Sequence, residues 1–100
     1  MKVLVGKDAD IKEGRLKGVA ADGRKFIVGR YQGQLFGMDG KCSHAGFDLL
    51  YGTIRDGRVV CPAHGAEFCI KDGAKVAHSG AKDLRVYIVS VEGDDAYIEI

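Results

Sequence analysis

The sequence predicts an all-β domain built as a sandwich or barrel. Fifteen glycines and one proline interrupt short apolar runs along 100 residues. No segment sustains the 3.6-residue period of an amphipathic helix. Runs rich in β-branched and aromatic side chains alternate with turn-forming residues about every ten positions, which is typical of antiparallel β structure.

Four hairpins are expected in order along the chain. Asp56-Gly57 is a favoured turn, because both central positions of a two-residue hairpin loop select residues that tolerate positive φ. Residues 48–51 are the one segment that fits a helical turn. The predicted strand pairs are 25–31 with 34–38 around Gln32-Gly33, 53–55 with 58–60 around Asp56-Gly57, 67–70 with 74–76 around 71–73, and 84–91 with 96–100 around 92–95.

Composition and charge fit one compact domain and exclude several classes of function. Lys and Arg number 15 against 14 Asp and Glu, which leaves a net charge of +1. Nucleic acids and anionic membranes require a concentrated basic face, so neither is expected as the main partner. The apolar run at residues 3–5 is too short for a secretory leader, and no run approaches the roughly 18 apolar residues of a membrane span. Three cysteines do not suit a disulfide framework, so we expect a cytoplasmic protein.

Two short pairs carry the main functional signal. Cys42 and His44 form the first pair, Cys61 and His64 form the second, and sixteen residues separate them. Two sulfur and two nitrogen ligands can hold zinc or an iron–sulfur cluster. The pairs therefore predict a four-ligand metal site.

The mixed order of the pairs favours the cluster and leaves zinc as the alternative. A familiar zinc finger groups its two cysteines in one pair and its two histidines in the other. Here each pair offers one of each, which suits two irons if each loop sends its cysteine to one iron and its histidine to the other. Gly46 and Gly65 follow the histidines and permit the sharp backbone conformations that such loops need.

The pattern Cys-x-His, sixteen residues, Cys-x-x-His resembles the Rieske [2Fe–2S] family. The resemblance runs from about Lys25 onward, and its matching segments are 42–46, 61–68, 71–73 and 89–93. It implies one [2Fe–2S] cluster. Cys42 and Cys61 would bind one iron, and His44 and His64 would bind the other.

The same resemblance implies a fold and a division of the chain. The fold would be an antiparallel β-sandwich or partly open barrel with a small cluster-binding subdomain of two loops. A single domain would span residues 1–100. Its cluster-binding subdomain would cover about 40–80, and its basal β domain would cover 1–39 and 81–100.

Four residues beside the ligands imply a low-potential member of the family. Phe47 and Ala63 stand where the respiratory type has the cysteines of a disulfide across the cluster. Ala66 and Phe68 stand where that type places hydroxyl donors to the cluster sulfurs. Since such hydrogen bonds stabilise the reduced state, their loss lowers the potential, and we expect roughly −150 to −50 mV.

The function implied by the resemblance is one-electron transfer without substrate chemistry. A flavin-containing reductase would supply the electron, and a terminal enzyme such as an aromatic-ring oxygenase would accept it. A fully coordinated cluster has no open position for a substrate, unlike a catalytic metal site. Two alternatives stay open: a Rieske subunit of a larger enzyme such as a nitrite reductase, and a structural zinc-binding module.

Several other residues near the predicted ligands have no assigned part in the site. Cys69 is expected to be a small buried hydrophobe in a strand, and His78 is expected to be a surface residue. The third loop, near residues 77–81, lacks the proline that many family members carry there. Three apolar residues fit either the core or a docking rim near the cluster: Phe47, Leu49 and Leu50.

Overall fold

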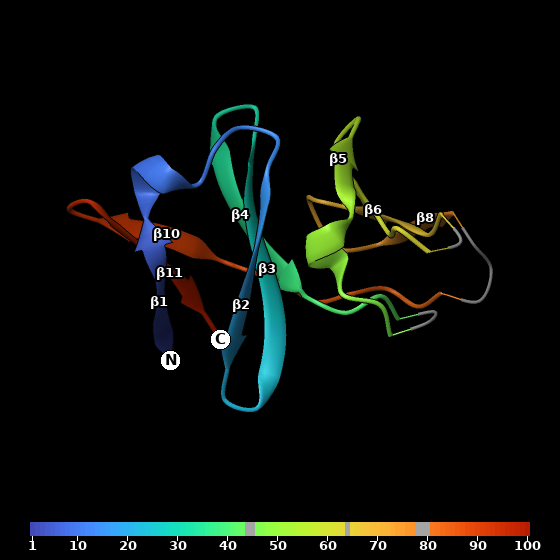
Figure 1. Ribbon diagram of the computed structural model, residues 1–100, viewed down its shortest axis with the longest axis horizontal. Coiled ribbons are helices and arrows are strands. Elements are labelled where there is room, and N and C mark those ends of the chain that lie inside the picture. Colours follow the sequence, from blue (N-terminus) through green and yellow to red (C-terminus); the bar gives the residue numbers. More distant parts are fainter. Residues whose placement is uncertain (44–45, 64, 78–80) are drawn as a thin grey trace.

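The computed structural model describes residues 1–43, 46–63, 65–77 and 81–100. Eleven strands and two short 3-10 helices are assigned within these ranges (Figure 1). In chain order they are β1 (Lys2–Lys7), η1 (Asp8–Asp10), β2 (Leu16–Ala21), β3 (Arg24–Tyr31), β4 (Gln34–Asp39), η2 (Leu49–Tyr51), β5 (Thr53–Arg55), β6 (Arg58–Val60), β7 (Glu67–Cys69), β8 (Lys75–Ala77), β9 (Val86–Tyr87), β10 (Val89–Glu92) and β11 (Asp95–Glu99).

The strands form three antiparallel sheets, none of which closes into a barrel. Their orders are β1-β11-β10, β2-β3-β4-β9 and β5-β6-β7-β8. The third sheet lies at one end of the molecule, beside the loops that carry the cysteines (Figure 1). The all-β prediction is confirmed, and the open sheets correspond to a sandwich. In the described ranges, no helix has the length and apolar character needed to cross a membrane.

Two-residue turns with positive φ at both positions set the registers of the hairpins. Gln32 and Gly33 have φ values of 51° and 79°, and Asp56 and Gly57 have 51° and 77°. These two predicted hairpins are confirmed, and their strands pair without a register shift. A third turn of the same kind, at residues 22–23, joins β2 to β3, which the sequence did not predict.

The prediction of one continuous strand over residues 84–91 is wrong, because the structure divides this segment into β9 and β10. Val86 and Tyr87 pair with β4 in one sheet, whereas Val89 begins a strand that pairs with β11 in another. Ile88 lies between them and is 75% exposed. The chain crosses from one sheet to the next at this residue, so neither sheet covers its side chain.

The sheet β2-β3-β4-β9 separates two apolar cores. Adjacent residues of a strand point to opposite faces, so Ile27 lies in one core while Phe26 and Val28 lie in the other. The core shared with β1-β11-β10, which we call the sheet core, consists of Val5, Ile11, Phe26, Val28, Ala96 and Ile98. The opposite core, which we call the loop-side core, consists of Ile27, Phe36, Met38, Cys42, Leu49, Val59, Cys61, Ala66, Phe68, Ala81 and Leu84. The loop-side core therefore contains both predicted cysteine ligands.

Candidate metal centre

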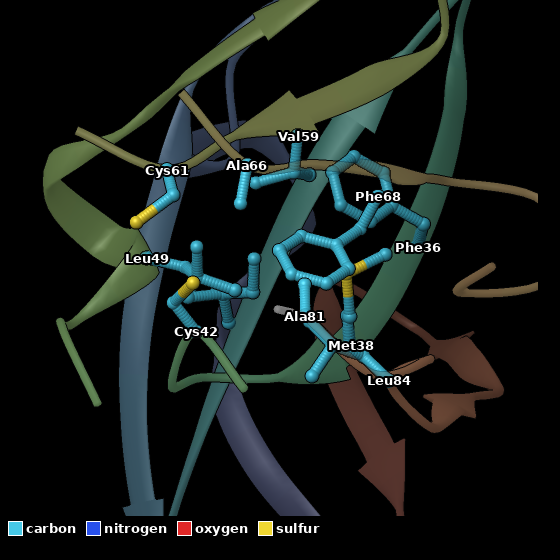
Figure 2. Packing of buried hydrophobic residues seen from close by; sticks show 11 residues of the cluster. Phe36, Met38, Cys42, Leu49, Val59, Cys61, Ala66, Phe68, Ala81 and Leu84 are labelled. Carbon is cyan, nitrogen blue, oxygen red and sulfur yellow. The ribbon is translucent and has the colours of Figure 1, made fainter. Parts of the chain in front are cut away.

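Cys42 and Cys61 come from different loops and meet in the loop-side core. Each is 2% exposed, and neither forms a disulfide. Figure 2 shows both sulfur atoms at the same edge of this core, next to Leu49. Residues 19 positions apart in the sequence are thus brought to one buried place.

The two loops close in the same way. The Cys42 N–H donates to the Phe47 carbonyl at 2.8 Å, and the Cys61 N–H donates to the Ala66 carbonyl at 2.7 Å. In each loop the bond spans five residues. The residue just before the acceptor is a glycine with positive φ, and the values are 69° at Gly46 and 70° at Gly65. No atom lies within 4 Å of a Cβ built on either glycine, so only the backbone conformation selects glycine there, as the sequence predicted.

The two predicted histidine ligands, His44 and His64, lie outside the described residues, as does His78. Within the described ranges, no group of three His, Cys, Asp or Glu side chains lies close enough together to hold a metal ion. The structure therefore places half of the predicted ligand set, the two sulfurs.

The chemistry of these two thiols fits a metal centre. Burial raises the pKa of the Cys61 thiol, a backbone hydrogen bond at Ala63 opposes the rise, and the neighbouring Cys42 thiol adds to it. Two adjacent buried thiolates without a cation would repel each other in an apolar environment. A bound metal centre removes this conflict, because metal ions take the place of the protons.

The walls of the site are apolar. Ala66 and Phe68 are fully buried in the same core as the two cysteines, and Leu49 is also fully buried. Of the three residues predicted to form a core or a rim, only Leu49 belongs to the core. Phe47 is 50% exposed and Leu50 is 37% exposed, so both present apolar surface beside the first loop.

A third segment is tied to the first loop by Ser43, a residue that the sequence analysis missed. The Ser43 hydroxyl donates to the Lys82 carbonyl at 2.6 Å and accepts from the Lys82 N–H at 2.8 Å. The Leu84 N–H donates to the Gly73 carbonyl at 2.8 Å, and Ala81 is 2% exposed in the loop-side core. No local sequence signal connects position 43 to position 82. Cys69 is half-buried on β7 and does not belong to the loop-side core that holds the other two cysteines.

Comparison with known proteins defines the class. The family model of the Rieske [2Fe–2S] domain matches residues 1–88. The ferredoxin component of biphenyl 2,3-dioxygenase from Rhodococcus jostii (strain RHA1) is 33% identical over 75 residues, which cover 75% of this chain and 70% of that protein.

Two solved structures share the fold. The ferredoxin of carbazole 1,9a-dioxygenase from Nocardioides aromaticivorans IC177 has a TM-score of 0.90 at 26% identity, over 98% of this chain and 96% of that one. A ferredoxin in a complex of reduced oxygenase and oxidized ferredoxin of carbazole 1,9a-dioxygenase also has a TM-score of 0.90, at 24% identity, over 97% and 91% of the two chains.

The chain therefore belongs to the Rieske [2Fe–2S] domain family. It carries one cluster of the Rieske type, and its function is electron transfer rather than catalysis.

Proposed function

We propose that Cys42 and Cys61 bind one iron of the cluster and that His44 and His64 bind the other. The observation that carries this assignment is the meeting of Cys42 and Cys61 in one buried place, on two loops with the same closure. Rieske clusters have two cysteines on one iron and two histidines on the other. The cluster supplies a site that gains and loses one electron, and the loops exclude water from its sulfur ligands.

We further propose that the chain is the ferredoxin component of an aromatic-ring oxygenase system. It would accept an electron from a flavin-containing reductase and pass it to a terminal oxygenase. The curated relative is a ferredoxin component of a dioxygenase, and a similarly folded ferredoxin has been solved together with its oxygenase. Phe47 and Leu50 give the carrier an exposed apolar surface beside the first loop, which suits a brief docking contact.

The proposed carrier works at low potential in a reducing compartment, the cytoplasm. Ala66 and Phe68 offer no hydroxyl to the cluster sulfurs, and both are fully buried beside the cysteines. We expect a midpoint potential on the order of −150 to −50 mV. All three cysteines are described and none is bridged, which suits a reducing environment. Residues 40–80 would form the cluster-binding subdomain on a basal β domain.

Ligand substitutions and a transfer assay test this proposal together. Cys61→Ser and His64→Ala should each abolish the visible spectrum of the cluster, whereas Cys69→Ser should retain it. The intact protein, reduced by an NADH-dependent flavin reductase, should then be reoxidised on rapid mixing with the oxidised terminal oxygenase component of biphenyl dioxygenase. Bleaching by Cys69→Ser would refute the ligand set. The carrier role would be refuted if the chain copurified stoichiometrically with a larger enzyme such as a nitrite reductase and transferred no electron to an oxygenase.

A further inference from the structure

A carboxylate follows each cysteine at the same distance along the chain. Asp48 lies six residues after Cys42, and Glu67 lies six residues after Cys61. Each acid directly follows the residue whose carbonyl accepts the cysteine N–H. The equal spacing and the shared loop closure place both carboxylates at equivalent positions, where the chain leaves a loop.

Each of these carboxylates lies between two cations. Asp48 is 3.2 Å from the Lys25 ammonium and 4.0 Å from the Lys41 ammonium. Glu67 is 3.2 Å from the Arg55 guanidinium and 3.3 Å from the Arg58 guanidinium. We call these two groups the Asp48 triad and the Glu67 triad. Each has two positive charges and one negative charge, so its net charge is +1.

The carboxylates face inward and the cations face outward. Glu67 is 15% exposed and Asp48 is 27% exposed, whereas the four cations range from 43% to 63%. The cations therefore compensate the negative charge of the two partly buried carboxylates. The net positive charge of each triad lies beside a loop that carries a cysteine.

We propose that the two triads tune the reduction potential by stabilising the reduced cluster electrostatically. The inference rests on the proposed ligand assignment. A Rieske cluster with two thiolates and two neutral imidazoles has a formal charge of about zero when oxidised and −1 when reduced. A net positive charge near it stabilises the reduced state more than the oxidised one. The carboxylates limit this effect, because each adds a negative charge that disfavours reduction.

The expected effects are small and have opposite signs within one triad. At a separation on the order of 10 Å, one unit charge changes the redox equilibrium constant about twofold in water and about fifteenfold near a protein surface. Glu67→Gln removes a negative charge and should raise the midpoint potential. Arg55→Gln and Arg58→Gln each remove a positive charge and should lower it. In the Asp48 triad, Asp48→Asn should likewise raise the midpoint potential and Lys25→Gln should lower it.

Protein-film voltammetry of the holoprotein and of each variant tests the inference. The matched control is the exposed pair of Lys7 and Asp95, 3.7 Å apart on β1 and β11, in the sheet at the end of the molecule opposite β5, β6 and β8 (Figure 1). Lys7→Gln should shift the potential much less than Arg58→Gln. Arg58→Lys keeps the charge and should leave the parent value unchanged. All triad shifts should shrink as the ionic strength rises from about 0.02 M to about 0.5 M, because salt screens exposed charges.

The outcomes separate this inference from the proposed function. Absence of a Rieske-type electron paramagnetic resonance (EPR) spectrum from the parent protein would refute the ligand assignment itself. A normal spectrum, with triad variants that shift the potential no more than Lys7→Gln, would overturn the electrostatic role. So would acidic and basic substitutions that shift it in the same direction, because a structural disturbance has no charge-dependent sign.

Discussion

Ser43 and Lys82, 39 residues apart in the sequence, are joined by a reciprocal pair of hydrogen bonds. The serine hydroxyl uses its proton on the Lys82 carbonyl and one lone pair on the Lys82 N–H. Because Ser43 directly follows Cys42, this pair attaches the first cysteine loop to residues 81–84 of the chain. The segment is also held from its other side, where the Lys75 N–H donates to Asp83 at 3.0 Å.

We expect Ser43→Ala to loosen the cluster without unfolding the domain. The variant loses two hydrogen bonds at an exposed position, which are worth about 1 kcal/mol each. The rate at which a chelator bleaches the visible spectrum should therefore rise several-fold. Ser43→Thr keeps the hydroxyl and should bleach at a rate near that of the parent. The control is Ser90→Ala, on β10 in the sheet β1-β11-β10. An equal rise in its bleaching rate would contradict the role of the Ser43–Lys82 hydrogen bonds.

Leu49→Ala should destabilise the domain strongly. The side chain is fully buried in the loop-side core beside the two cysteines, and its removal leaves a cavity that costs about 2–5 kcal/mol. Leu50→Ala, one residue along, is a matched control because Leu50 is 37% exposed. Urea unfolding should show a much larger loss for Leu49→Ala. Equal losses would mean that the loop-side core does not depend on Leu49.

Gly73→Ala should be more damaging than glycine substitution at another turn. Gly73 has φ of +77°, and a Cβ there would lie 2.0 Å from the Leu84 carbonyl oxygen. Gly23 has φ of +71° with no atom within 4 Å of a Cβ, so Gly23→Ala carries only the conformational cost of about 1–2 kcal/mol. The difference between the losses of unfolding free energy in the two variants gives the cost of the contact between a Cβ at position 73 and the Leu84 carbonyl. A difference near zero would show that this approach relaxes freely.

Tyr87 should make the domain sensitive to alkaline pH. Burial raises the pKa of its phenol, and the Asp39 carboxylate, which accepts the Tyr87 hydroxyl at 2.7 Å, raises it further. Because the native state holds this proton more tightly than the unfolded chain does, the stabilisation is fully present below about pH 10. It is lost as the pH rises through the raised native pKa.

Tyr87→Phe should remove part of that pH dependence. The variant should be less stable than the parent near neutral pH, because it lacks the hydrogen bond to Asp39. It should then lose less stability between pH 8 and pH 11 in urea unfolding. Tyr51→Phe, at a ring that is 71% exposed, should lose as much as the parent. Identical pH dependence of Tyr87→Phe and the parent would contradict the link to Asp39.

Local chemistry determined which parts of the fold the sequence could predict. The Asp56-Gly57 hairpin was predicted to the residue because a two-residue turn with positive φ sets its own register. The helical turn at Leu49–Tyr51 was also confirmed. β2 was missed because its strand has Gly18, two alanines and only one β-branched residue, Val19, and so carries little of the composition that marks strands. The division at Ile88 depends on which sheet each neighbour joins, and no local pattern encodes that choice.

The candidate site shows the same division between local and distant information. The cysteines and the glycines after them were sufficient to predict two loops that serve one site, whereas their equivalent closure is seen only in the structure. The contact from Ser43 to Lys82 and the two triads bring together residues that are distant in the sequence. Such pairings follow from the packing of the sheets, so they could be found only in the structure.

Our central proposal is that Cys42, His44, Cys61 and His64 hold a histidine-ligated [2Fe–2S] cluster. The most direct test is the EPR spectrum of the dithionite-reduced protein. We expect a rhombic signal with an unusually low average g value, from a reddish-brown protein with two irons per chain. A colourless protein with one bound zinc and no signal would contradict it.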